Sequence, residues 1–133
     1  MPANQLELRV LDTRLALCRL PGGSPPPAWV SGDLAAVVST PHETSIVCDE
    51  AVVPSDVQCQ PGWTALMVAG PLDFSLTGVL AAIAGPLAEA RVSIFAVSTF
   101  DTDYVLVPAD RIADAVHALR KAGHRVMLPS DGA

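Results

Sequence analysis

The sequence has 133 residues and a formal net charge of −6, with half of its residues apolar and 5% aromatic. Its 14 acidic and 8 basic residues argue against nucleic-acid binding, which requires clustered cations. The stretch from Leu20 to Ala90 contains seven carboxylates and no Lys or Arg, which argues against binding to an anionic membrane surface. The uncharged stretches are shorter than the ~20 apolar residues of a transmembrane helix, and no secretory signal pattern is visible, so we expect one domain, or two small lobes, in the cytoplasm.

Short strands dominate the first sixty residues. Leu6–Leu11 and Leu15–Leu20 alternate and are joined by turn residues, which predicts a β-hairpin. After a proline-rich loop, Leu34–Ser39 predicts a third strand. The segment Thr40–Glu43 has the spacing of a helix capping box and predicts a single helical turn, because Ile46–Cys48 already reads as the next strand.

The second half has a clearer pattern. The predicted elements are a strand over 64–69, a helix over 76–87, strands over 92–99 and 104–107, a helix over 110–121 and a strand over 125–127. Asp73 or Ser75 could cap the first helix, and Pro86 should kink it or end it early. Gly123 should end the second helix.

This order, β-α-β-β-α-β, predicts an α+β protein with a ferredoxin-like unit. The first half offers strands with one-turn helices, which we interpret as a degenerate copy of the same unit packed beside the first. The expected lobes are residues 1–60 and residues 61–133.

The cysteines Cys18, Cys48 and Cys59 are odd in number and lack CxxC spacing. A disulfide framework or a zinc site is therefore not expected, and reduced, mostly buried thiols fit better. No motif points to a cofactor.

Two segments could carry chemistry. The first joins a strand to a helix and comprises Gly70, Pro71, Leu72, Asp73, Phe74 and Ser75. Unpaired backbone N–H groups at a helix start attract a carboxylate without Arg or Lys. The alternative is an ordinary N-cap and turn that binds only water.

The second segment joins two strands and comprises Ser98, Thr99, Phe100, Asp101, Thr102 and Asp103. Its two carboxylates could hold an ammonium or guanidinium group. They could also cap their own backbone in a polar hairpin tip, or bind Mg²⁺ or Ca²⁺, although two carboxylates make a weak cation site.

The motif Gly70–Ser75 before a helix, followed by Ile94–Val107, resembles the ACT domain. It is similar to the small stand-alone ACT proteins, to the regulatory regions of aspartate kinases and to the cytosolic arginine-sensor family. Thr40–Glu43 and Ser45–Cys48 resemble the first lobe of these proteins more loosely.

The resemblance implies a homodimer or paired lobes that bind an allosteric amino-acid effector at their interface. It places the effector between Gly70–Ser75 and Ser98–Asp103, with Asp103 at an acidic position that contacts the amino or guanidinium group. No kinase or dehydrogenase domain is attached, so the regulated partner would be another chain, such as an enzyme of amino-acid metabolism.

Catalytic motifs are missing from the sequence. His42, His117 and His124 are scattered, and each is expected at the surface or in a turn. We therefore expect a non-catalytic, amino-acid-binding regulatory module. The alternatives are a protein–protein interaction or oligomerisation module without a ligand, and a small hydrolase or isomerase that uses Asp101 or Asp103 as a base.

Overall fold

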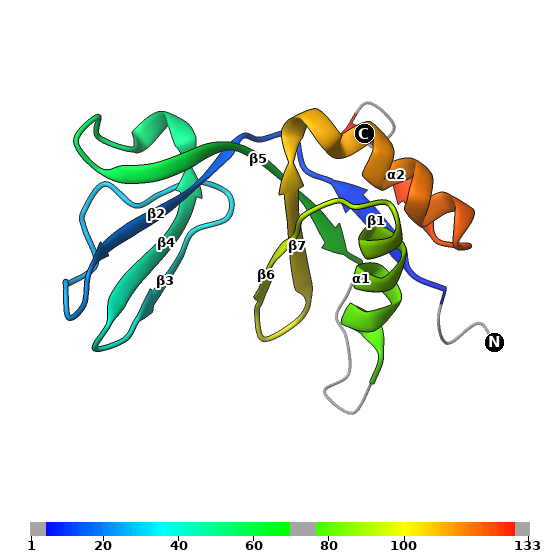
Figure 1. Cartoon of the computed structure of the whole chain (residues 1–133), viewed down its shortest axis with the longest axis horizontal. Coiled ribbons are helices and arrows are strands. Elements are labelled where there is room, and N and C mark those ends of the chain that lie inside the picture. The colour runs from blue at the N-terminus through cyan, green and yellow to red at the C-terminus, as the bar shows by residue number, and fades with distance from the viewer. Residues whose placement is uncertain (1–4, 70–76, 130–133) are drawn as a thin grey trace. The chain divides into compact units, whose positions relative to one another are not determined.

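The computed structural model describes residues 5–69 and 77–129 (Figure 1). The elements in chain order are the strands β1 (Glu7–Val10), β2 (Leu15–Pro21), β3 (Ala36–Ser39), β4 (Glu43–Asp49), β5 (Gln58–Val68), β6 (Phe95–Ser98), β7 (Asp103–Pro108) and β8 (Arg125–Met127), the α-helices α1 (Val79–Glu89) and α2 (Ile112–Lys121), and the 3₁₀ helices η2 (Glu50–Val52) and η3 (Ala109–Arg111). They form two compact units, one of residues 1–12 and 64–133 and one of residues 13–63. Neither α-helix of the described segments has the length and apolar character needed to cross a membrane.

The unit of residues 1–12 and 64–133 has the predicted order β5-α1-β6-β7-α2-β8, so the ferredoxin-like topology is confirmed. Its strands lie in the order β6-β7-β5-β1-β8. The N-terminal strand β1 is inserted between β5 and β8, antiparallel to β5 and parallel to β8, with Leu8 opposite both Val68 and Val126.

The predicted hairpin of Leu6–Leu11 and Leu15–Leu20 is wrong. β1 pairs with β5 and β8, whereas β2 pairs with β4 and β5. The alternating apolar pattern predicts which side chains face a core, but it does not identify the neighbouring strand. As a result, β1 belongs to the unit of residues 64–133 and not to a lobe of residues 1–60.

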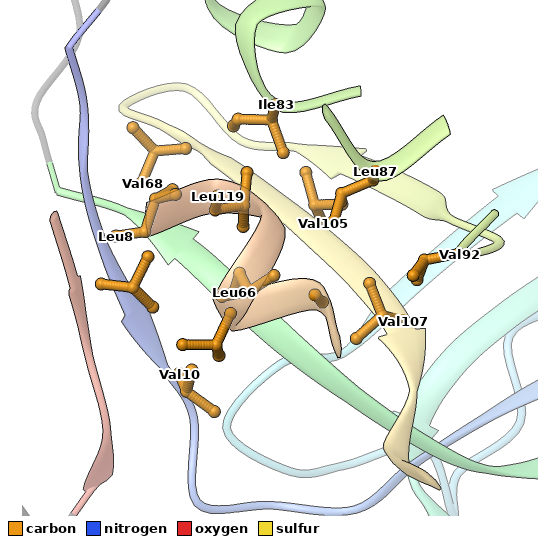
Figure 2. Packing of buried hydrophobic residues seen from close by; sticks show 13 residues of the cluster. Leu8, Val10, Leu66, Val68, Ile83, Leu87, Val92, Val105, Val107 and Leu119 are labelled. Atoms are coloured by element: carbon orange, nitrogen blue, oxygen red, sulfur yellow. The ribbon is translucent and has the colours of Figure 1, made fainter. Parts of the chain in front are cut away.

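The core of this unit lies between its sheet and its two helices (Figure 2). The strands contribute alternate residues from one face, which is the period-2 pattern of a sheet covered on that side. The buried members are Leu8, Val10, Leu66, Val68, Ile83, Leu87, Val92, Val105, Val107, Ala115, Val116, Leu119 and Val126. Each large aliphatic side chain contributes about 1.5–3 kcal/mol on full burial.

Helix α1 continues through Pro86 to Glu89, so the predicted early end is wrong. Proline has no N–H, so the Ala82 carbonyl loses its usual i+4 partner. The ring of His124 replaces that partner, with Nε2 3.0 Å from the Ala82 oxygen. His124 is therefore buried, at 6% exposure, and the prediction of a surface or turn position for it is wrong.

The unit of residues 13–63, all of which are described, has the strand order β3-β4-β2-β5 and no α-helix. The predicted helical turn at Thr40 is instead the turn between β3 and β4. There the Thr40 N–H donates to the Glu43 carbonyl at 2.9 Å, and its Oγ1 accepts from the N–H groups of His42 and Glu43 at 3.1 and 3.0 Å. The capping hydrogen bonds thus form without a helix. The core here contains Ala16, Cys18, Ile46 and Cys48.

Candidate functional site

The second predicted segment forms the tip of the β6–β7 hairpin. Ser98 lies opposite Asp103 in the ladder, and residues 99–102 form the loop. The Thr99 N–H donates to the Thr102 carbonyl at 2.8 Å, and the Thr102 N–H donates to Thr99 Oγ1 at 3.2 Å. The loop is therefore closed by its own threonines, which fixes the positions of the neighbouring carboxylates.

A further hydrogen bond connects this tip to β5. The Thr102 hydroxyl donates to the carbonyl oxygen of Val68, the last residue of β5, at 2.5 Å. The chain continues from β5 into the first predicted segment. Those residues, Gly70, Pro71, Leu72, Asp73, Phe74 and Ser75, lie outside the described residues. The hairpin tip is therefore next to the point at which that segment begins.

The two carboxylates of the tip have different surroundings. Asp103 is half-buried and accepts a 2.6 Å hydrogen bond from the Ser98 hydroxyl. Asp101 is exposed and has no hydrogen-bond or ion-pair partner within residues 5–69 and 77–129. The ion pairs of those residues, Arg19–Glu43 and Arg111–Asp114, are elsewhere. Neither tip carboxylate is neutralised by a described base, so the tip can accept hydrogen bonds from a cation.

The structure changes the expected helix start. α1 begins at Val79 with Gly78 as its N-cap in the left-handed region, at φ 80°, so the predicted caps Asp73 and Ser75 are wrong. Glycine adopts this conformation without the cost that a Cβ imposes. The first predicted segment is therefore separated from the first turn of α1 by Leu76, Thr77 and Gly78.

Other chemistry has little support in the described residues. No group of His, Cys, Asp and Glu among them is arranged to hold a metal ion. His42 and His117 are exposed, as predicted, and both ring nitrogens of His124 are occupied by structural hydrogen bonds. The prediction missed the buried position of His124, because no local signal in the sequence links Pro86 to a histidine that follows the last helix.

Two surface hollows of about 380 Å³ each flank α2. One lies between α1 and α2, and the other is lined by α2 and Leu128. Neither contains a residue of the two predicted segments.

These features define a protein with an ACT-type fold, and the comparisons with known proteins agree. The family model described as the ACT domain matches residues 58–121. A solved structure of protein Atu0741 from Agobacterium tumefaciens is 34% identical over 93% of both chains, with a TM-score of 0.88. The chain belongs to the ACT-domain family.

Two other relatives share parts of the sequence or only the fold. The human cytosolic arginine sensor for mTORC1 subunit 1 is 42% identical over 60 residues, which are 44% of this chain and 18% of the sensor. The regulatory subunit of aspartate kinase from Thermus thermophilus has a TM-score of 0.58 at 17% identity, over 85% of this chain and 95% of the subunit. The likeness to the aspartate kinase subunit concerns the fold alone.

Proposed function

We propose that this protein is a non-catalytic regulatory module that binds an amino-acid effector, with Ser98–Asp103 and Gly70–Ser75 as the two sides of the site. The observation that carries the proposal is the pair of carboxylates, Asp101 and Asp103, on a closed hairpin tip next to the end of β5. Neither has a basic partner among the described residues.

The unneutralised carboxylates favour a ligand with a positive end. A hydrogen bond between charged groups contributes about 1.5–3 kcal/mol, so two such contacts would hold an ammonium or guanidinium group. The backbone amides of Gly70–Ser75 would bind the α-carboxylate, because no Lys or Arg lies between Leu20 and Ala90. The relative named as an arginine sensor supports a cationic amino acid.

The same proposal covers the setting of the module. We expect a cytoplasmic homodimer in which the effector lies at a lobe or subunit interface, as the ACT resemblance implies. We also expect the N-terminal lobe, predicted over residues 1–60 and corresponding to the unit of residues 13–63, to be a degenerate ACT-like lobe. The effector would then control a separate partner, such as an enzyme of amino-acid metabolism.

A thermal-shift screen over the common amino acids tests the site. A ligand at 100 times its Kd adds about 2.7 kcal/mol to the free energy of unfolding, which raises Tm by several degrees. Asp103→Asn and Asp101→Asn should abolish or weaken that shift. Asp56→Asn, which removes one charge from an exposed turn in residues 13–63, is the matched control and should retain it.

If no amino acid raises Tm by more than about one degree at millimolar concentration, the effector proposal is wrong. It is also wrong if Asp103→Asn and Asp56→Asn respond equally to the ligand that does bind.

The second candidate is an interaction module without a small-molecule ligand. β6 pairs only with β7 among the described strands, and Phe95 at its start and Ile94 directly before it are each 38% exposed. An open edge with apolar side chains favours pairing with another chain. A dimer that persists on dilution, disrupted by Phe95→Glu and indifferent to every amino acid, would support this candidate over the first.

A further inference from the structure

All three cysteines of the chain converge on one place in the unit of residues 13–63. Cys48 lies on β4, Cys18 on β2 and Cys59 on β5, and these strands are neighbours in the order β4-β2-β5. The thiols of Cys48 and Cys59 both lie close enough to Cys18 to help raise its pKa. All three thiols are free.

The ladder distinguishes the two possible pairs. Cys18 and Cys59 are direct antiparallel partners, whereas Cys48 is opposite Ala16 and only diagonal to Cys18. Directly opposed residues of antiparallel strands have Cα atoms about 4.5–5.5 Å apart, within the roughly 4.4–6.8 Å that a disulfide spans. The backbone register therefore already suits a bond between Cys18 and Cys59.

Accessibility determines where oxidation can begin. Cys18 is 4% exposed and Cys48 is fully buried, whereas Cys59 is half-buried. Burial raises the pKa of the Cys18 thiol to about 12 and also raises the pKa of Cys48, so both are protonated at neutral pH. A dissolved oxidant reaches Cys59 first, because nucleophilic attack needs an accessible sulfur.

We propose that Cys59 and Cys18 are an oxidant-responsive thiol pair that closes to a cross-strand disulfide between β5 and β2. With a peroxide, Cys59 sulfur attacks one peroxide oxygen, the O–O bond breaks, and a sulfenic acid and one water form. The Cys18 sulfur then attacks the Cys59 sulfur, and the sulfenic oxygen leaves as a second water with the Cys18 proton. Two thiols lose two electrons and the peroxide is reduced to two waters.

The bond would join two strands that already pair, so it should preserve the fold and stabilise it. A disulfide that closes a long loop lowers the entropy of the unfolded chain, and we expect Tm to rise by roughly 5–10 °C. Cys48 is the buried neighbour of Cys18 and remains a thiol. A dithiol reductant reverses the change.

The test exposes the full-length native protein to hydrogen peroxide, then denatures it and alkylates the remaining thiols before peptide mass mapping. The expected product is monomeric, is lighter by about 2 Da before alkylation, and is alkylated only at Cys48. Cys48→Ala is the matched control and should form the same bond. Cys59→Ala should leave Cys18 unoxidised for at least ~10-fold longer.

Three results would overturn the proposal. The first is Cys59 carried to a sulfinic or sulfonic acid with Cys18 still free. The second is a bond between Cys18 and Cys48 or between two chains in the unmodified protein. The third is an oxidised protein with an unchanged or lower Tm, which would mean that the pair is not aligned for the bond.

Discussion

His124 and Pro86 provide a quantitative test of how the helical unit is held together. The Leu6 N–H can only donate, and it donates to His124 Nδ1 at 3.0 Å. The Ala82 carbonyl can only accept, so Nε2, at 3.0 Å from it, must carry the ring proton. The neutral imidazole of His124 therefore accepts from the Leu6 N–H, directly before β1, and donates to the Ala82 carbonyl in α1, which Pro86 leaves without its helical partner.

Substituting His124→Ala removes both hydrogen bonds and leaves two polar backbone groups without their partner. Each such group costs about 1–2 kcal/mol when it is buried, so the free energy of unfolding should fall by about 2–4 kcal/mol. For a chain of 133 residues this corresponds to a Tm lower by roughly 6–15 °C. His117→Ala, at an exposed histidine, should change stability by less than about 0.5 kcal/mol.

The cause is separated from simple loss of packing by a double-mutant cycle with Pro86→Ala. An alanine at position 86 restores an N–H that can donate to Ala82, which matters most when His124 is absent. Urea denaturation followed by circular dichroism should show that Pro86→Ala stabilises the His124→Ala protein by about 1 kcal/mol more than it stabilises the parent. Equal effects in both backgrounds, within about 0.3 kcal/mol, would refute the assigned role of His124.

Further outcomes follow from single contacts. Gly22→Ala should lower the free energy of unfolding by about 2 kcal/mol or more, because the added Cβ would be 2.0 Å from the Pro41 carbonyl oxygen. Gly85→Ala should raise it by about 0.5–1 kcal/mol, because Gly85 lies in α1 with open space where the Cβ would be. Thermal or urea denaturation measures both changes. Arg111→Met should lower the free energy of unfolding by about 1–2 kcal/mol, because the Arg111 guanidinium donates to the carbonyls of Ala90 and Arg91, directly after α1, at 3.2 and 3.3 Å. An unchanged denaturation midpoint would contradict this prediction. Burial raises the pKa of the Cys18 thiol in the folded protein to about 12, from an ordinary value of 9.0. The thiol therefore ionises at a lower pH in the unfolded chain than in the folded one, and the free energy of unfolding should fall between pH 9 and pH 12 by up to about 1.4 kcal/mol per pH unit. Cys18→Ala should flatten that slope in denaturation series at alkaline pH.

Local sequence patterns were sufficient for the type and order of the elements in the second half of the chain, although not for the two ends of α1. The apolar spacing of α2 and its stop at Gly123, which has φ 102°, are both decided within a few residues of sequence. The β-α-β-β-α-β order followed from such signals. The pairing partners of β1 could not be predicted from local signals, because strand pairing is set by contacts between residues far apart in the sequence.

The same distinction applies to Pro86. The rule that a helical proline removes a hydrogen bond is correct here, but α1 does not end early at Pro86, and His124 supplies a replacement donor for the Ala82 carbonyl. A bond between residues this distant cannot be read from the periodicity of α1. Only the backbone fold brings the two together.

The candidate site was predictable only where it depends on residues that are close in the sequence. Turn residues between two strands predicted the hairpin tip, and the register that sets Ser98 opposite Asp103 explains their hydrogen bond. The bond from Thr102 to Val68 could not be predicted, since it requires β7 to lie beside β5.

The ladder through β5 connects the hairpin tip to the stabilising contacts of the N-terminal strand. Thr102 binds the carbonyl of Val68, Val68 is opposite Leu8, and Leu8 is opposite Val126 in β8. Stability and ligand binding are nevertheless separable, because ligand adds RT ln(1 + [L]/Kd) to whatever stability the variant has. If Asp101 and Asp103 bind the effector, a His124→Ala protein should start from a lower Tm and keep the full ligand-induced increase in the free energy of unfolding. A loss of that increase would instead mean that the tip depends on the position of β1.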